Sequence, residues 1–250
     1  MNNYLLTLKY VGTAYSGSQI QRNAPSIQGA LQRALTAVLG ARPDVKCCSR
    51  TDAGVHAHKF CVSFLCDSAL APARLAMALN MRLPADIRVM RAQTVPPDFH
   101  ARYDCVSKKY IYRVYNDNVL DPFYVDRAHR FSPHIDEKQL AALAALFVGR
   151  HDFGAFCNIR TKTPDDTVRT VSECTVCREG PLVIFTIAAD GFLYNMVRII
   201  VGALLNAARG KLGEAEIAAL LEDGRRGNLC ATAPACGLYL EDVIYKDIEA

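Results

Sequence analysis

Residues Ser49-Arg50-Thr51-Asp52-Ala53-Gly54-Val55-His56-Ala57 form a short polar stretch between two segments with the character of β-strands. The stretch has no apolar periodicity, which predicts a loop. Gly54 allows a positive φ or a close approach of the backbone to a ligand, and Asp52 places a carboxylate in this constrained setting. Loops held by rigid strands are common positions for chemistry, although an ordinary Asx turn fits the same residues.

The sequence around this loop predicts a βαββαβ order, the ferredoxin-like arrangement. Pro25 and Ser26 precede a segment with apolar residues at helical spacing, and Gly40 ends it. The loop before this helix, residues 11–24, holds glycine, tyrosine and glutamine side chains suited to contacting a ligand. The expected elements are strands at 4–10, 45–48, 60–64 and 87–95 and helices at 27–39 and 72–80.

A similar order recurs in the second half of the chain. It predicts an α+β protein of two ferredoxin-like, RRM-like subdomains related by duplication, with sheets flanking a central cleft. We expect one domain at 1–104, which carries the Asp52 loop, and a second at 105–250. Residues 117–133 are expected to be an irregular connection. The expected elements are strands at 108–115, 171–177, 182–188 and 238–245 and helices at 136–147, 192–208 and 214–221.

The composition, 51% hydrophobic and 22% charged residues in a chain of 250, is typical of a globular protein. Residues 1–104 hold 12 Lys and Arg against 6 Asp and Glu, whereas residues 105–250 hold 17 against 19. The basic first half favours a polyanionic partner. Ten cysteines without an export signal favour reduced thiols and a cytoplasmic location. The longest apolar segment, 192–208, is too short and too polar to span a membrane.

Arg198 lies on a predicted helix that is apolar around most of its circumference. A buried guanidinium without a carboxylate costs several kcal/mol, roughly, so we expect it to have a partner. Pairing across the cleft with Asp52 would keep that carboxylate ionised, as a nucleophile requires. The alternative is that Arg198 reaches the surface along its aliphatic stem.

Tyr110 follows Lys108 and Lys109 and shares a strand face with Tyr112. Basic residues beside an aromatic ring suit a nucleobase that has left its stack, because the charge meets phosphate and the ring stacks on the base. The alternative is an ordinary pair of tyrosines in a sheet core.

Metal and nucleotide-cofactor sites have weak support. His56, His58 and Cys61, or Cys174 and Cys177, could each supply half of a zinc site, but the paired knuckle spacing of structural zinc sites is missing. Cys174 and Cys177 lie on an alternating strand, which directs them to opposite faces. The glycine-rich phosphate-binding motifs are also missing.

Several segments in order resemble the tRNA pseudouridine synthase A family, and the most specific of them is Arg50-Thr51-Asp52-Ala53-Gly54-Val55-His56-Ala57. The resemblance covers nearly the whole chain. The other segments are Tyr15-Ser16-Gly17-Ser18-Gln19-Ile20-Gln21, Asp98-Phe99-His100-Ala101-Arg102-Tyr103, Lys109-Tyr110-Ile111-Tyr112, Met196-Val197-Arg198-Ile199-Ile200-Val201-Gly202, Ala233-Pro234 and Gly237-Leu238-Tyr239-Leu240.

The resemblance implies isomerisation of uridine to pseudouridine at positions 38, 39 and 40 of the tRNA anticodon stem-loop, without cofactor or metal, by a homodimer. It implies that Asp52 is the nucleophile and that Tyr110 stacks on the target base. It also implies that Arg198 pairs with the catalytic carboxylate and that Arg50 assists base extrusion. Leu238 and Leu240 fall in the segment that lines the family's pocket.

Three positions depart from the family pattern: Val11 stands where Asp is usual, Ser18 where Trp is usual, and Ser49 where Gly is usual. The first two lie in a loop expected to contact RNA. These two departures bear on the RNA contacts of that loop and not on the chemistry. The alternative to the enzyme is a non-catalytic RNA-binding module of the same fold, whose basic first half holds tRNA.

Overall fold

The computed structural model describes residues 1–158, 166–224 and 231–250 of the chain. These residues form two compact units, Met1–Lys108 with Tyr239–Ala250, and Lys109–Leu238. Both units combine strands with helices, which confirms the α+β class predicted from the sequence. The last strand clusters with the first unit, whereas the sequence placed all of residues 105–250 together. Backbone pairing between distant strands causes this difference, and local periodicity does not reveal it.

The first unit has the predicted βαββαβ order, with strands β1 (Asn2–Tyr10), β2 (Lys46–Cys47), β3 (His56–Cys66) and β4 (Ile87–Val95). Strand β1 lies between β4 and β3 and is antiparallel to both, and β2 is antiparallel to β3. The strand order 4-1-3-2 is that of a ferredoxin-like sheet. Strand β10 (Leu238–Tyr245) also pairs with β3, in parallel at its other end.

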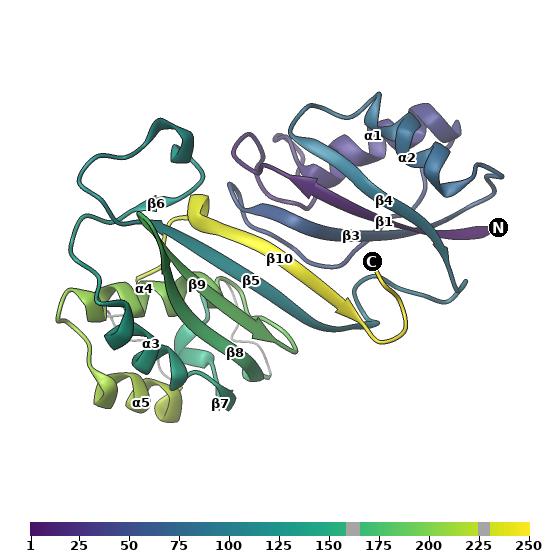
Figure 1. Ribbon diagram of the computed structural model, residues 1–250. Helices are drawn as coiled ribbons and strands as arrows, with labels where there is room; N and C mark the ends of the chain where they lie inside the picture. The colour runs from purple at the N-terminus through teal and green to yellow at the C-terminus, as the bar shows by residue number, and fades with distance from the viewer. Residues whose placement is uncertain (159–165, 225–230) are drawn as a thin grey trace. The chain divides into compact units, whose positions relative to one another are not determined.

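Helices α1 (Ile27–Leu39) and α2 (Pro72–Asn80) lie side by side on one face of this sheet (Figure 1). Both bounds agree with the helical spacing in the sequence. The Ser26 hydroxyl accepts a hydrogen bond from the Gly29 N–H at the start of α1. Gly40 ends α1 in the left-handed conformation, with φ of 72°. These two caps fix α1 locally, as N-cap serine and C-terminal glycine commonly do.

In the second unit, strands β5 (Cys105–Tyr115), β9 (Leu182–Ala189), β8 (Val168–Glu179) and β7 (Gly149–Asp152) are neighbours in that order. Strands β8 and β9 form the expected antiparallel pair across the Gly180 turn. The segment at residues 117–133, which was expected to be irregular, holds a two-residue strand, β6 (His129–Arg130). This strand pairs with β5. That segment also holds the short 3-10 helix η1 (Pro122–Tyr124), and two others are η2 (Gly154–Phe156) and η3 (Ala235–Gly237).

Helices α3 (Glu137–Ala145), α4 (Met196–Ala208) and α5 (Glu214–Asp223) lie on one face of β8 and β9 (Figure 1). Helix α4 begins four residues later than the sequence predicted. Asn195 has a left-handed φ of 62°, which keeps the preceding residues out of the helix. Residues 192–195 therefore lie in a loop, where Leu193 is buried and the other three are partly exposed.

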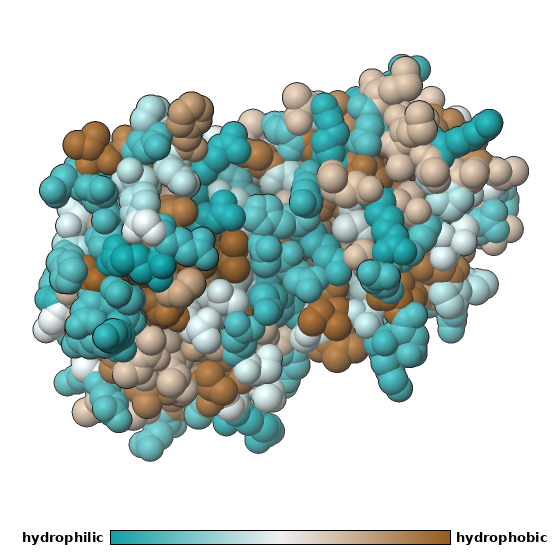
Figure 2. Space-filling view, viewed as in Figure 1, coloured by the Kyte–Doolittle hydropathy of each residue, from teal (hydrophilic) through white to brown (hydrophobic). Residues whose placement is uncertain are grey.

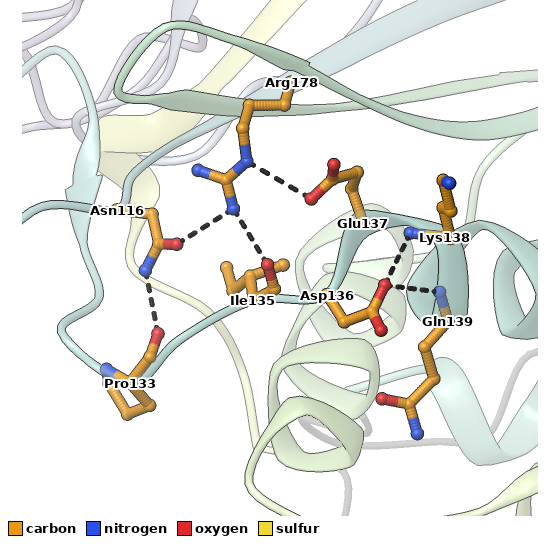
Figure 3. A network of polar contacts seen from close by, with 8 residues as sticks. All are labelled: Asn116, Pro133, Ile135, Asp136, Glu137, Lys138, Gln139 and Arg178. Atoms are coloured by element: carbon orange, nitrogen blue, oxygen red, sulfur yellow. Dashed lines mark hydrogen bonds and ion pairs between the residues drawn. The ribbon is translucent and has the colours of Figure 1, made fainter.

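Arg178 of β8 fastens the start of α3 to its sheet (Figure 3). Its guanidinium donates to the Glu137 carboxylate at 3.2 Å, to the Ile135 carbonyl at 2.8 Å and to the Asn116 amide oxygen at 3.1 Å. The Asp136 carboxylate caps α3 by accepting from the backbone N–H groups of the second and third residues that follow it. Arg178 therefore has a structural role.

Hydrophobic side chains on the face drawn in Figure 2 occur as separate small groups among hydrophilic ones. Scattered exposed apolar residues of this kind are normal for a folded protein. Among the described residues, none of the helices has the length and apolar character that crossing a bilayer requires.

Candidate active site

The Asp52 loop is a tight turn between β2 and β3. The Val55 N–H donates to the Asp52 carbonyl at 3.2 Å, which closes a four-residue turn. Gly54, the third residue of this turn, has φ of 78°, a value that side chains strongly disfavour. The sequence prediction of a loop with a special backbone at Gly54 is therefore confirmed. The Asp52 side chain is half-buried.

The loop at residues 11–24 holds the Asp52 loop by hydrogen bonds to its backbone. The Ser18 hydroxyl accepts from the Thr51 N–H at 2.8 Å, and the Ser18 N–H donates to the Thr51 carbonyl at 3.1 Å. On the other side of Asp52, the Gly54 N–H donates to the Tyr15 carbonyl at 3.2 Å. The backbone is therefore fixed both immediately before Asp52 and two residues after it.

Two glycines allow this close approach. A Cβ atom on Gly12 would lie 1.9 Å from the Val55 carbonyl oxygen, so no side chain fits there. Gly17 has φ of 104°, and a Cβ on it would lie 2.7 Å from the Thr51 carbonyl oxygen. The glycines of the first loop are thus required for packing against the second.

Strand β10 lies beside the end of the Asp52 loop. Tyr239 and Leu240 are opposite His56 and Ala57 in the parallel pairing with β3. The rings of His56 and Tyr239 stack with centroids 4.6 Å apart. The His56 Nδ1 atom accepts the Gly12 N–H at 3.0 Å, so the proton of a neutral His56 ring is on Nε2. Leu240 is fully buried beside this arrangement.

His56 and His58, which the sequence offered as part of a zinc site, have protein partners in the first unit instead. His58 Nδ1 lies 2.5 Å from a carboxylate oxygen of Glu241. In β8, Cys174 is buried and Cys177 is exposed, in agreement with the expected opposite faces. Across the described residues, the structure has no group of three or more His, Cys, Asp or Glu side chains arranged to hold a metal ion.

Tyr110 and Arg198 lie in the second unit. Tyr110 is buried in β5, and its ring meets that of Phe192 edge-on with centroids 4.9 Å apart. Arg198 is half-buried in α4, and its Nε atom donates to the Ala233 carbonyl at 2.7 Å. The Ala233 N–H in turn donates to the Arg198 carbonyl at 3.0 Å. Arg198 thus holds the segment that precedes η3.

The segment at residues 231–233 also accounts for the need for glycine at position 202 of α4. A Cβ on Gly202 would lie 1.8 Å from the Ala231 carbonyl oxygen, so the segment at 231–233 lies directly on the helix backbone. The hydroxyl of Tyr112 donates to the Pro234 carbonyl at 2.8 Å. Burial raises the pKa of Tyr112, which keeps this hydroxyl protonated and able to donate.

The structure therefore places the predicted site residues in two groups. Arg50, Asp52 and Leu240 belong to the first unit, and Tyr110, Arg198 and Leu238 to the second. Pairing of Asp52 with Arg198 joins residues of different units and stays a prediction. Sequence reasoning missed the role of Ser18, which it noted only as a departure from a family pattern. The one sequence feature that pointed to this role is the presence of a small polar residue next to Gly17.

Comparisons with known proteins show the family to which this chain belongs. A family model described as tRNA pseudouridine synthase matches residues 7–104 and 143–246. A tRNA pseudouridine synthase A of Methylacidiphilum infernorum is 42% identical over 242 residues, which are 97% of this chain and 95% of that protein. A tRNA pseudouridine synthase A of Acetivibrio thermocellus is 40% identical over 98% of this chain and 100% of that protein. The chain belongs to the tRNA pseudouridine synthase family, a family of isomerases.

Proposed function

We propose that this protein converts uridine to pseudouridine at positions 38, 39 and 40 of the tRNA anticodon stem-loop, with Asp52 as the nucleophile. The observation that carries the proposal is the position of Asp52. Its carboxylate is on a turn fixed on both sides by the loop at residues 11–24. A carboxylate held in this way is prepared for reaction before the substrate arrives.

The reaction exchanges one glycosidic bond for another. The bond between C1′ and N1 breaks, the uracil rotates, and a bond between C1′ and C5 forms. The proton on C5 leaves and N1 gains one, so the product is an isomer of the substrate. Asp52 would assist the cleavage by attack on the sugar, by attack on the base or by helping a sugar proton to leave. No water molecule has to be activated, so one carboxylate is sufficient.

The other proposed residues bind the substrate. Enzymes that act on a base must first remove it from its stack, and we assign help in this extrusion to the exposed Arg50. We assign stacking on the target base to Tyr110 and pairing with the catalytic carboxylate to Arg198. Leu238 and Leu240 are buried, apolar candidates for the pocket lining. The net positive charge of residues 1–104 suits the phosphate backbone of tRNA.

Two further parts of the proposal concern the oligomeric state of the protein and its location in the cell. The family resemblance supports a homodimer, and the ten cysteines support a cytoplasmic location for the protein. Sedimentation of the purified protein with and without tRNA would give the oligomeric state. A monomer in both conditions would contradict the dimer.

The deciding experiment measures pseudouridine in an unmodified tRNA transcript incubated with the wild type or with Asp52→Asn. We expect product from the wild type at positions 38 to 40 and none from the variant. Binding of tRNA should stay within a few-fold, because phosphate contacts dominate affinity. A suitable control is Asp67→Asn, because the Asp67 side chain is 79% exposed.

The alternative, a non-catalytic RNA-binding module of the same fold, predicts a different outcome. The wild type would then bind tRNA and give no pseudouridine. Equal losses of binding and of turnover in Asp52→Asn would instead give Asp52 a structural role.

A further inference from the structure

A small polar cavity opens beside the Asp52 loop within the first unit, with a volume of about 240 Å³. Ser49 and Arg50, from the start of that loop, line one part of it. Residues His100, Arg102 and Tyr103, from the turn after β4, line another part. Ordinary small-molecule pockets measure roughly 300–1,000 Å³, so the cavity suits a single small unit rather than a large cofactor.

The lining of this cavity is positively charged. Lys46, Arg50 and Arg102 contribute cations, and none of the side chains that line the cavity is a carboxylate. Lys46 also pairs with Asp44, which lies outside the lining. Cations gathered without acidic partners in the lining favour an anionic ligand.

The turn at residues 100–104 has a defined shape. The His100 Nδ1 atom accepts the N–H groups of Arg102 at 3.1 Å and of Tyr103 at 3.3 Å. The Asp104 carboxylate accepts the His100 N–H at 2.7 Å. Because Nδ1 is an acceptor here, a neutral His100 carries its proton on Nε2, which leaves this atom as a hydrogen-bond donor.

The same turn is anchored to the core of the first unit. The Ala101 N–H donates to the Ser63 hydroxyl of β3 at 3.0 Å. The Tyr245 hydroxyl of β10 donates to the Ala101 carbonyl at 2.7 Å. Burial raises the pKa of Tyr245, which keeps this donor protonated. The turn therefore holds its side chains in fixed positions.

Tyr103 is the unusual member of the turn, because 76% of its surface is exposed. The centroid of its ring lies 4.3 Å from that of the His100 ring. The guanidinium carbon of Arg102 lies 5.9 Å from the centroid of the Tyr103 ring. An exposed ring on a rigid turn beside cations contributes little to the core. It is, however, the combination that stacks on a nucleobase and contacts its phosphate in proteins that bind single-stranded RNA.

We propose that this cavity binds one nucleotide of the tRNA next to the target uridine. Tyr103 stacks on the base, and Arg102 with Lys46 contacts the phosphate. His100 Nε2–H donates a further hydrogen bond. The inference rests on the proposed function, because it places this nucleotide beside the Asp52 loop. It gives the first unit a base contact that is separate from the one assigned to Tyr110.

The test measures the Kd of a labelled anticodon stem-loop RNA by fluorescence anisotropy at several salt concentrations. We expect Tyr103→Leu to weaken binding by roughly 5- to 100-fold, the range of one lost base stack. Tyr103→Phe should bind like the wild type, since it keeps the ring. Arg102→Gln should weaken binding and reduce the salt dependence by about one phosphate contact.

The control is Arg82→Gln, which removes an exposed cation that does not line the cavity. It should bind like the wild type. In both Tyr103→Leu and Arg102→Gln the loss should appear in Kd and in the single-turnover rate at subsaturating RNA. Thermal unfolding of each variant would verify that the turn is intact.

The outcomes separate this inference from the proposed function. Wild-type affinity in both Tyr103→Leu and Arg102→Gln overturns the inference. A lower saturated rate with unchanged Kd also overturns it. Weaker binding by these variants, together with a wild type that forms no pseudouridine, supports an RNA site here and refutes the proposed isomerisation.

Discussion

Ser18 and Thr51 are joined by two hydrogen bonds, one from the Thr51 N–H to the Ser18 hydroxyl at 2.8 Å and one from the Ser18 N–H to the Thr51 carbonyl at 3.1 Å. Ser18 is almost fully buried. Ser18 thus binds both the N–H and the carbonyl of Thr51, the residue that precedes Asp52. The family resemblance leads one to expect a tryptophan at this position, and here a small hydroxyl side chain supports the Asp52 loop.

We predict that Ser18→Ala destabilises the loop that carries Asp52. The variant leaves the buried Thr51 N–H without its acceptor, which costs about 1–3 kcal/mol. Chemical denaturation would measure the change in the free energy of unfolding, and single-turnover kinetics the change in rate. Ser132→Ala, at an exposed position of the second unit, is the control. A rate equal to that of the wild type would mean that this support does not matter for catalysis.

We predict that Gly12→Ala slows the reaction as well as destabilising the fold. The new Cβ would displace the Val55 carbonyl, three residues after Asp52, and overpacking of this kind costs about 1–3 kcal/mol. Gly40→Ala is the matched control: its φ of 72° makes alanine strained, but nothing lies within 4 Å of the added atom. It should lower the melting temperature and leave the rate unchanged. Equal rates in both variants would contradict the prediction.

We predict that Arg198→Met loses both stability and activity. The variant removes the donor to the Ala233 carbonyl, and by the predicted pairing it also removes the partner of the Asp52 carboxylate. The pseudouridine-forming rate should fall by about tenfold or more, which corresponds to about 1.4 kcal/mol in the barrier. Arg150→Met, at an exposed position, is the control. Lower stability with a wild-type rate would refute the pairing.

We predict an acid-sensitive contribution to stability from Glu137. Hydrogen bonding to its own backbone N–H, and then to Arg178, lowers the pKa of Glu137 below its ordinary 4.5. Because the folded pKa lies below the unfolded one, the stabilisation is present above about pH 4.5 and is lost as the pH falls through the folded value. The difference in unfolding free energy between the wild type and Glu137→Gln should therefore shrink in acid. A difference independent of pH, or a similar one in the exposed control Glu179→Gln, would contradict this.

The sequence predicted the elements whose signals are local. Helix α1 has its N-cap serine, its apolar spacing and its terminal glycine within one short segment, and its bounds agree with the prediction. Strand β4 also has the predicted bounds. Strand β3 is longer than expected, because it begins at His56, where polar side chains hide the strand pattern.

The sequence could not predict contacts between distant segments. The bond between Ser18 and Thr51 spans 33 positions, and the one between Gly12 and His56 spans 44. The pairing of β10 with β3 depends on backbone groups that every residue carries, so no residue type marks it. The sequence motif pointed to Asp52. It did not point to the loop at residues 11–24 that holds Asp52, because most of the hydrogen bonds between the two loops come from main-chain groups.

The parallel pairing of Leu240 with Ala57 has a consequence for biosynthesis. Strand β10 follows the whole second unit in the chain, so the ribosome must complete that unit before this strand can join the first one. Domains normally fold in the order in which they are synthesised. A nascent or truncated chain therefore lacks the strand that pairs with His56 and Ala57, beside the Asp52 loop, until the second unit has also been made.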